Sequence, residues 1–385
     1  MVQMLSKHKG ALPDSMIIKM IDGGFIGGAN SVNVRPSSLD LTVSNEIYEV
    51  AGVFQPRSGE VVREVLAKIS KKKISLDEPL KQGGMYLARL NETLSLPENV
   101  YAYCNPKSSS GRIDVHVRLL ADHVSRYDAV TPAGWPRQSL PVRQAGAGKH
   151  GELWLSIMPK TFAIKLPRNY SLNQIRFFNA DTRFDELELE LAMQEQQLLW
   201  RVKKKIPFNY HELQIRDGDG AAILTLDISS KVVGYRGLAT KQVLDLSKMN
   251  YYAWDKFFEP LVIKKSDYLN LERDHFYIFS TSEAVRVSPE LACEMAPMDE
   301  RSGEFRSHYA GFIDPGWGWG RAGEGKGRPL TLELRPFEDL IVRDRQPIAK
   351  IKFERMIKLP ETVYDAGPSN YSKQSGPRLA KQFKF

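Results

Sequence analysis

The stretch Ser38-Leu39-Asp40-Leu41-Thr42-Val43 is short and rich in residues that favour a β-strand. Similar β-prone stretches follow at 84–90 and 114–119, and turns containing Pro or Gly separate them. Many short strands with turns between them are typical of an all-β barrel or sandwich. We therefore expect a mainly β protein with a few short helices, one of them over 14–26 and ended by Gly23-Gly24.

The second half of the chain repeats the order of these stretches. The strand at 38–43 has a counterpart in Thr225-Leu226-Asp227-Ile228-Ser229, and the stretch at 86–90 is echoed by Phe276-Tyr277-Ile278-Phe279-Ser280. An ordered series is harder to attribute to chance than a single match, so we expect two tandem copies of one fold.

The chain accordingly divides into four expected segments. They are a first repeat over 1–180, a connector over 181–210, a second repeat over 211–358 and a C-terminal arm over 359–385. The connector is rich in Glu at its start and in Lys at its end, which suits a helix dipole, although alternation over 186–191 would also suit a strand. The arm shows no apolar period, and we expect it to be mobile.

Composition favours an anionic partner without fixing which one. The 385 residues carry a formal net charge of +8, which suits nucleic acid or a nucleoside triphosphate. The densest basic runs, 71–73 and 203–205, hold only three lysines each, so we expect no nucleic-acid track. No apolar segment is long enough for a secretory signal or a membrane span, so we expect no membrane partner and a cytoplasmic location.

The metal-binding residue types are sparse. The only cysteines, Cys104 and Cys293, stand outside any CxxC, and the seven histidines show no paired metal spacing. We therefore expect no zinc site and no metal ligand set formed by the protein alone.

One polar motif could hold a phosphate chain. Lys107-Ser108-Ser109-Ser110-Gly111-Arg112 places two cations and three hydroxyls within six residues, and such groups form charge-assisted hydrogen bonds to phosphate oxygens. An ordinary polar turn would have the same composition, so this pattern leaves both interpretations open.

A second pair of motifs could hold and attack a ring. Gly311-Phe312-Ile313-Asp314-Pro315-Gly316-Trp317 is a Gly-bounded turn, and Leu330-Thr331-Leu332-Glu333-Leu334 alternates as a strand does. Glu333 would share a face with Thr331, opposite the leucines. On pattern alone, a solvent-facing strand carboxylate is the alternative.

These motifs together resemble the dCTP deaminase family of the trimeric dUTPase-like superfamily, in a form with two fused copies. The resemblance rests on four motifs and one residue: the 36–43 strand, Lys107-Ser108-Ser109-x-x-Arg112, Ile313-Asp314-Pro315-Gly316-Trp317, Glu333 in its strand, and the C-terminal stretch Asn370-Tyr371-Ser372-Lys373-Gln374-Ser375-Gly376. It implies two tandem dUTPase-like distorted β-barrels of jelly-roll type, assembled as a homo-oligomer that we expect to be a trimer.

The departures from the family pattern are complementary. In the first repeat the position of the catalytic Glu falls on Ser156, and in the second Lys-Ser-Ser is replaced by Ala296-Pro297-Met298, while Arg301 matches the Arg. The resemblance therefore implies a composite site, with one site per chain preferred over two. Whether its halves meet within one chain or between chains stays open.

The resemblance implies hydrolysis of dCTP to dUTP and ammonia, within dUTP and dTTP biosynthesis. Glu333 would shuttle protons, with Ser108 and Arg112 or Arg301 assisting catalysis. Substrate contacts would come from Lys107, Ser109, Asp314, Trp317, Tyr371, Lys373 and Gln374. Mg²⁺ would accompany the triphosphate, and the 371–376 segment would close over it.

Two alternatives remain open at this point. One is a dUTP diphosphatase, or a bifunctional enzyme that releases dUMP. The other is a nucleotide-binding regulator that has lost catalysis.

Overall fold

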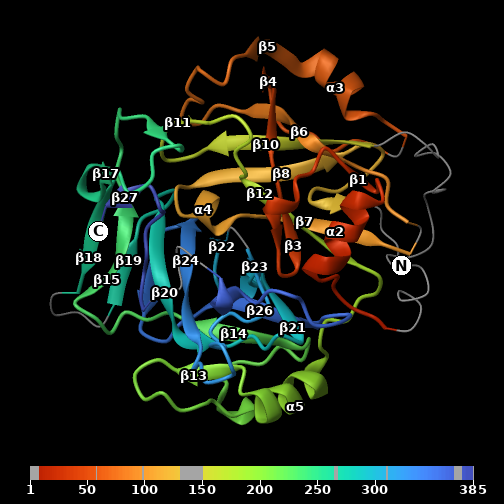
Figure 1. Cartoon of the computed structure of the whole chain (residues 1–385). Helices are drawn as coiled ribbons and strands as arrows, with labels where there is room; N and C mark the ends of the chain where they lie inside the picture. The colour runs from red at the N-terminus through yellow and green to blue at the C-terminus, as the bar shows by residue number, and fades with distance from the viewer. Residues whose placement is uncertain are drawn as a thin grey trace. The chain divides into compact units, whose positions relative to one another are not determined.

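The computed structural model describes residues 8–57, 59–97, 99–130, 151–263, 268–308, 311–367 and 375–384. The chain forms two compact units (Figure 1). Unit 1 contains Met1–Thr182, Lys241–Met249 and Met356–Glu361; unit 2 contains Arg183–Thr240, Asn250–Arg355 and Thr362–Phe385. Most of the expected connector and most of the expected arm thus belong to the second compact unit.

The described residues of unit 1 form mainly short strands, with three α-helices. In chain order its helices and strands are α2 (Asp14–Asp22), β1 (Ile26–Gly27), β2 (Val34–Arg35), β3 (Ser38–Leu41), β4 (Val43–Val50), α3 (Val62–Ile69), β5 (Ser70–Ile74), β6 (Tyr86–Leu94), β7 (Tyr101–Pro106), α4 (Ser108–Gly111), β8 (Val115–Ala121), β9 (Ala129–Val130), β10 (Gly151–Pro159), β11 (Ile164–Lys165), β12 (Asn173–Phe178) and β16 (Leu244–Asp245).

Unit 2 has the same character, with one longer helix. Its helices and strands are α5 (Glu186–Gln196), β13 (Leu199–Arg201), β14 (Ala221–Thr225), β15 (Val232–Gly237), β17 (Tyr252–Ala253), β18 (Phe258–Val262), β19 (Tyr268–Leu271), β20 (Tyr277–Val285), β21 (Leu291–Ala296), β22 (Phe305–His308), β23 (Phe312–Ile313), β24 (Arg328–Pro336), β25 (Leu340–Arg343), β26 (Pro347–Arg355) and β27 (Phe383–Lys384). The segment that could have been helix or strand is helix α5, which Asp185 and Glu188 begin with a reciprocal capping box.

The two units share one strand order. In unit 1 the larger sheet runs β5-β4-β6-β10-β8, with β1 on β6, and the smaller runs β2-β3-β12-β7-β9. In unit 2 the larger sheet runs β18-β15-β20-β24-β22, with β13 on β20, and the smaller runs β14-β26-β21-β23. The expectation of a mainly β fold in two tandem copies is confirmed.

A buried Thr–Glu pair fixes the correspondence between the repeats. Glu92 accepts hydrogen bonds from the backbone N–H of Thr42 at 2.9 Å and from its hydroxyl at 2.7 Å. Glu283 accepts the same two bonds from Thr225, at 2.8 and 2.7 Å. Burial raises the pKa of both carboxyl groups, against the effect of these hydrogen bonds. Each carboxylate therefore joins one sheet to the other at an equivalent place.

This pair corrects the register expected from sequence. Thr42 corresponds to Thr225, so Asp40 corresponds to Ile223 and not to Asp227. Likewise Tyr86 corresponds to Tyr277, because each tyrosine hydroxyl accepts a hydrogen bond from the backbone N–H five residues before it. The correspondence expected from sequence was wrong here, because similar residues recur at neighbouring positions of a strand. Only the hydrogen-bond register decides which of them are equivalent.

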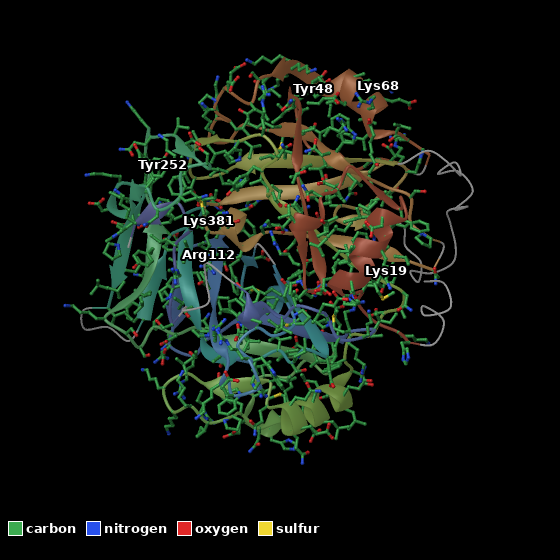
Figure 2. The ribbon with its side chains drawn as sticks, in the orientation of Figure 1. Lys19, Tyr48, Lys68, Arg112, Tyr252 and Lys381 are labelled. Carbon is green, nitrogen blue, oxygen red and sulfur yellow. The ribbon has the colours of Figure 1, made fainter. Side chains whose placement is uncertain are left out.

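The chain's last residues are firmly packed, which contradicts the expectation of a mobile arm for this part. Leu379, Ala380 and Phe383 are buried, and β27 pairs in parallel with β17. The Phe383 ring lies 5.3 Å from the rings of both Phe257 and Phe258. In Figure 2, Tyr252 and Lys381 mark this corner of unit 2.

The described residues contain no helix long and apolar enough to cross a membrane.

Candidate functional site

The phosphate motif of unit 1 forms one helical turn after β7. Lys107 is extended, and its carbonyl accepts from the N–H groups of Ser110 and Gly111, which closes the turn α4. Arg112, labelled in Figure 2, follows the turn and is 3% exposed. Its Nε donates to the Ser108 hydroxyl at 3.0 Å. The turn thereby places a hydroxyl and a guanidinium in contact, as expected for groups that act on one anion.

A buried carboxylate holds the lysine of this motif. The Lys107 ammonium lies 2.5 Å from Asp40 Oδ2, and an Arg35 guanidinium nitrogen lies 2.7 Å from the same oxygen. The Asp40 side chain is only 3% exposed, whereas that of Lys107 is 24% exposed. Asp40 therefore fixes two cations at the start of the motif. A partly exposed lysine with three donors can still turn the others toward a phosphate.

Unit 2 replaces this ion pair by apolar residues. Asp40 and Asn105 flank Gln174 across their sheet, as Ile223 and Ala296 flank Lys350. Counting two residues onward, Lys107 corresponds to Met298, which packs against the unit 2 core. Both partners of the ion pair have thus changed together, to Ile and Met.

The same register corrects the correspondence of Ala296-Pro297-Met298 and Arg301. Met298, and not Ala296, stands at the lysine position, and the place of Arg112 falls on Ser302 or Gly303. The Arg301 side chain is 79% exposed and forms an ion pair with Asp299 at 2.7 Å. Its catalytic role stays a prediction.

Glu333 lies on the middle of β24, in the larger sheet of unit 2. Leu330, Leu332 and Leu334 belong to the hydrophobic core, so Thr331 and Glu333 lie on the opposite face of the strand. Glu333 is 2% exposed, which contradicts the alternative of a solvent-facing strand carboxylate. A carboxylate on the face away from the core, yet buried, suits proton transfer in a site that excludes water.

Ser156 occupies the Glu333 position of unit 1. Ser156 pairs with Leu87 as Glu333 pairs with Ile278, and Leu87 corresponds to Ile278. This register agrees with the position expected from sequence. A serine hydroxyl does not ionise near neutral pH and cannot replace a carboxylate as the base, so unit 1 lacks the proton-transfer group here.

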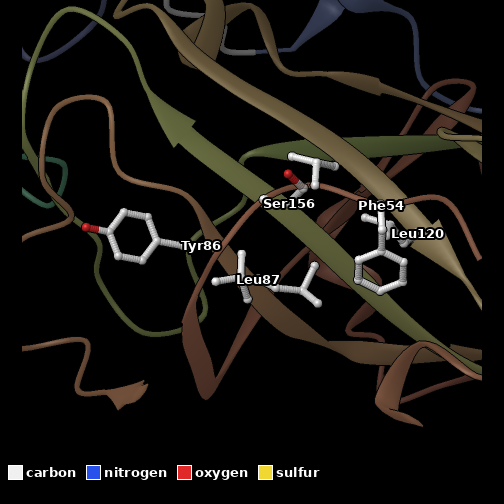
Figure 3. A pocket seen from close by; sticks show the side chains of 8 residues that line it. Phe54, Tyr86, Leu87, Leu120 and Ser156 are labelled. Atoms are coloured by element: carbon white, nitrogen blue, oxygen red, sulfur yellow. The ribbon is translucent and has the colours of Figure 1, made fainter. Parts of the chain in front are cut away.

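The surroundings of Ser156 are mainly apolar. Ser156 lines a narrow pocket together with Phe54, Leu87 and Leu120 (Figure 3). Helix α3 covers this face of the sheet, because Val62 and Leu66 share a buried cluster with Leu87, Leu120 and Trp154. Unit 1 has therefore both lost the carboxylate and packed the face that would carry it.

The turn at Asp314 is fixed by the chain after β26. Gly316 has φ +89°, and a Cβ there would come within 2.6 Å of Val363 Cβ, so only glycine fits. The Pro315 carbonyl accepts from the Tyr364 N–H. Asp314 itself is 8% exposed. The turn is held rigid by its neighbours, which suits a residue that orients a ligand.

Trp317 has a packing role. It lies in the core of unit 2, its ring centroid is 4.9 Å from that of Tyr364, and the Arg328 guanidinium lies over it at 5.7 Å. Arg328 is itself held in place, since it pairs with Asp365 at 2.6 Å. Contact of Trp317 with substrate stays a prediction.

Comparison with known proteins identifies the family. Residues 8–181 match the model of the 2'-deoxycytidine 5'-triphosphate deaminase N-terminal domain, and residues 193–383 match that of the C-terminal domain. The chain belongs to the dCTP deaminase family. It is accordingly an enzyme, of a family that acts on a carbon–nitrogen bond.

A solved structure agrees with this assignment. The crystal structure of 2'-deoxycytidine 5'-triphosphate deaminase from Agrobacterium tumefaciens is 31% identical, covers 91% of this chain and all of its own, and superposes with a TM-score of 0.78. No curated protein matches the chain. The match over both domains confirms the tandem dUTPase-like fold.

Each unit of this dCTP deaminase family member gathers part of the expected site. Unit 1 holds Lys107, Ser108, Ser109 and Arg112 on one turn and its flanks. Unit 2 holds the remaining expected residues that the structure describes, namely Arg301, Asp314, Trp317 and Glu333. The expected substrate ligands Tyr371, Lys373 and Gln374 lie outside the described residues.

Two residues of the site act through a partner and carry no sequence signal of their own, namely Asp40 and Arg35. Asp40 lies in the 36–43 strand motif and Arg35 lies outside it, and no sequence pattern reveals an ion pair between residues 67 positions apart, as Asp40 and Lys107 are. Strand alternation places Thr331 on the face of Glu333, whereas its cross-strand neighbour Ser280 is identified only by the pairing of β20 with β24.

Proposed function

We propose that this chain catalyses the reaction dCTP + H2O → dUTP + NH3, with Glu333 as the group that moves protons. The observation that carries the proposal is the Glu333 carboxylate, which is 2% exposed and lies on the side of β24 away from the core. The two halves of the chain match the deaminase family. Water must lose a proton as it adds to C4 of the ring, and the ring nitrogen and the leaving amine must gain one. One carboxylate can make these transfers in turn.

The phosphate motif would hold the triphosphate. Lys107 and Arg112 supply the cations, and the hydroxyls of Ser108 and Ser109 supply further donors. Arg112 would also stabilise the charge that develops on Glu333 or on the ring, with Ser108 orienting its guanidinium as in the contact at 3.0 Å.

A magnesium ion fits this arrangement only as a companion of the phosphates. The motif presents cations and hydroxyls, and Asp40 already binds two cations. Among the described residues, no three His, Cys, Asp or Glu side chains cluster into a metal site. Mg²⁺ would therefore be held by phosphate oxygens and water, and its chemistry would be to neutralise phosphate charge.

The decisive experiment compares Glu333→Gln with the wild type. The variant keeps the shape and removes the base, so turnover of dCTP should fall roughly 10²-fold or more while dCTP binding is largely kept. Ammonia release and dUTP formation measure turnover, and Glu338→Gln, an exposed carboxylate two residues beyond β24, is the matched control. Near-normal turnover by Glu333→Gln would overturn the assignment.

The same assays address the alternatives. Incubation with dUTP followed by pyrophosphate analysis would detect a diphosphatase, and tight dCTP binding by a wild type that does not turn over would indicate a regulator. Chelation of zinc should leave activity intact, while removal of Mg²⁺ should lower it. The comparisons support the deaminase and neither alternative.

We also propose that the chain works as a homotrimer in the cytoplasm, without a nucleic-acid or membrane partner. The family resemblance supports the trimer, and the absence of any basic run longer than three lysines supports the lack of a nucleic-acid partner. Light scattering should give three times the chain mass of 43.7 kDa.

A further inference from the structure

Two hydroxyls share the sheet face of Glu333. Ser280 on β20 pairs directly with Thr331 on β24, so their side chains lie on one face of the sheet. Glu333, two residues after Thr331, lies on the same face. Tyr277, Phe279 and the leucines of β24 form the core on the other face. Ser280, Thr331 and Glu333 thus form one polar row, away from the unit 2 core.

These hydroxyls are buried, and neither has a hydrogen-bond partner among the described residues. Ser280 is 2% exposed and Thr331 is 5% exposed. Within the part of the chain that the structure describes, neither Ser280 Oγ nor Thr331 Oγ1 takes part in a hydrogen bond. Buried polar groups are normally satisfied, and an ordered water with two to four polar partners is the usual means. Two hydroxyls beside a carboxylate provide such a set of partners.

The hydroxyl pair occurs only in the repeat that carries the carboxylate. In unit 1 the corresponding cross-strand pair is Arg89 and Trp154, next to Ser156. Trp154 belongs to the buried cluster under α3, and Arg89 donates to Glu46 at 3.0 Å. The small hydroxyl residues therefore accompany Glu333, and large residues replace them where the carboxylate is missing.

We propose that Ser280 and Thr331 hold a water molecule against Glu333, and that this water is the nucleophile of the deamination. The inference rests on the proposed function. The two hydroxyls fix the water oxygen, and Glu333 takes one of its protons as the oxygen bonds to C4 of the cytosine ring. Glu333 returns that proton to the ring nitrogen. The remaining hydroxyl proton of the adduct passes to the amine, which leaves as NH3 when its bond to C4 breaks and the C4 carbonyl of dUTP forms.

The test removes the hydroxyls while keeping size. Thr331→Val and Ser280→Ala should each lower kcat for dCTP about tenfold, and the double variant roughly 10²-fold, because each loses one hydrogen bond to the water. KM should change less than about threefold, since these residues hold water and not the nucleotide. Ser15→Ala is the control, because it removes another buried hydroxyl without a partner, on α2 of unit 1.

Hydroxyl-retaining variants separate chemistry from packing. Thr331→Ser should keep kcat within about threefold of the wild type, although it loses a methyl group. If Thr331→Ser is as impaired as Thr331→Val, or if KM rises while kcat stays normal, the water-holding role is overturned. If the double variant turns over normally while Glu333→Gln is inactive, only this inference fails. A wild type that releases no ammonia from dCTP would instead refute the proposed function itself.

Discussion

At the scale of single residues, the two repeats differ by whole pairs: where one repeat has an ion pair, both positions are apolar in the other. The Asp40–Lys107 ion pair of unit 1 stands where unit 2 has Ile223 and Met298. A buried charge without its partner is costly, whereas an apolar pair of similar size is tolerated. The exchange must therefore involve both positions, and the sequence of either repeat alone would not reveal it.

This exchange predicts how substitutions combine. Lys107→Met or Asp40→Ile alone should destabilise the protein by about 1–3 kcal/mol, because the first leaves the buried Asp40 with one of its two cations, Arg35, and the second leaves Lys107 and Arg35 without their carboxylate. The double variant Asp40→Ile/Lys107→Met should cost less than the sum, as in unit 2. Urea unfolding measures stability, and dCTP should bind weakly to the double variant despite its recovered fold. Strict additivity of the two costs would contradict the coupling.

A second residue-scale prediction concerns Ser156. The substitution Ser156→Glu restores the carboxylate position of unit 1 among Phe54, Leu87 and Leu120, and Arg118, which lies opposite it on β8, already pairs with Asp128. Burying this charge among apolar side chains should lower the melting temperature. Combined with Glu333→Gln, it should restore no turnover. Recovery of dCTP turnover in that double variant would show that unit 1 can form a working site.

At the scale of elements, helix α3 is fastened over unit 1 by a charge network. Arg63 forms a bidentate pair with Glu46 at 2.8 and 3.2 Å, a second pair with Glu152 at 2.8 Å, and lies over the Trp154 ring at 5.1 Å. The hydrogen bonds from Arg63 lower the pKa of Glu46 from 4.5 to about 2, against the effect of burial.

This network predicts a pH dependence of stability. The folded protein holds the Glu46 pKa below its unfolded value, so the stabilisation is fully present above about pH 4.5 and is lost as pH falls toward 2. Glu46→Gln should cost about 1–2 kcal/mol at pH 7, allowing for partial exposure, and little at pH 2. Thermal unfolding across this range measures the difference. An equal cost at both pH values would contradict the role of the charge.

The C-terminal segment leads to another element-scale prediction. Truncation after Asn370 would remove β27 and the buried Leu379 and Phe383, so it should unfold part of unit 2 as well as reduce activity. Phe383→Ala alone should cost about 3–5 kcal/mol. Lys384→Ala, at an exposed neighbouring position, is the control. A truncated protein with unchanged urea unfolding would show that this anchor is dispensable.

These elements show which parts of the fold and of the site can be predicted from the sequence. Alternation and turn residues predicted the strands, and the ordered repeat predicted two copies, because both signals are local or recur along the chain. The register between Asp40 and Ile223, the burial of Phe383 and the packing of Trp317 were missed. Each depends on which strands pair and which side chains meet at long range, which local pattern does not determine.

At the scale of the whole molecule, complementary losses favour a division of labour between the repeats. Unit 1 retains the phosphate motif but has covered its carboxylate face with α3, and unit 2 retains Glu333 but has Met298 in place of the lysine. Neither repeat alone has the groups for both binding and proton transfer. We therefore propose that a complete site draws on both repeats, so one carboxylate serves each site.

This division predicts that either half can disable the enzyme. Arg112→Ala and Glu333→Gln should each abolish most turnover, since the first removes a group that binds phosphate and stabilises charge and the second removes the base.

The two inactive variants can then be mixed under conditions that let subunits exchange. If the halves of a site come from different chains, some sites in the mixture hold two intact halves, and ammonia release should return to a measurable fraction of the wild-type rate. If both halves come from one chain, every site keeps one defect and no activity should return. Arg301→Ala serves as the comparison, because the Arg301 side chain is exposed and pairs with Asp299, two residues away. Loss of activity in Arg301→Ala with full activity in Arg112→Ala would show that the second repeat suffices by itself, and the composite site would then be wrong.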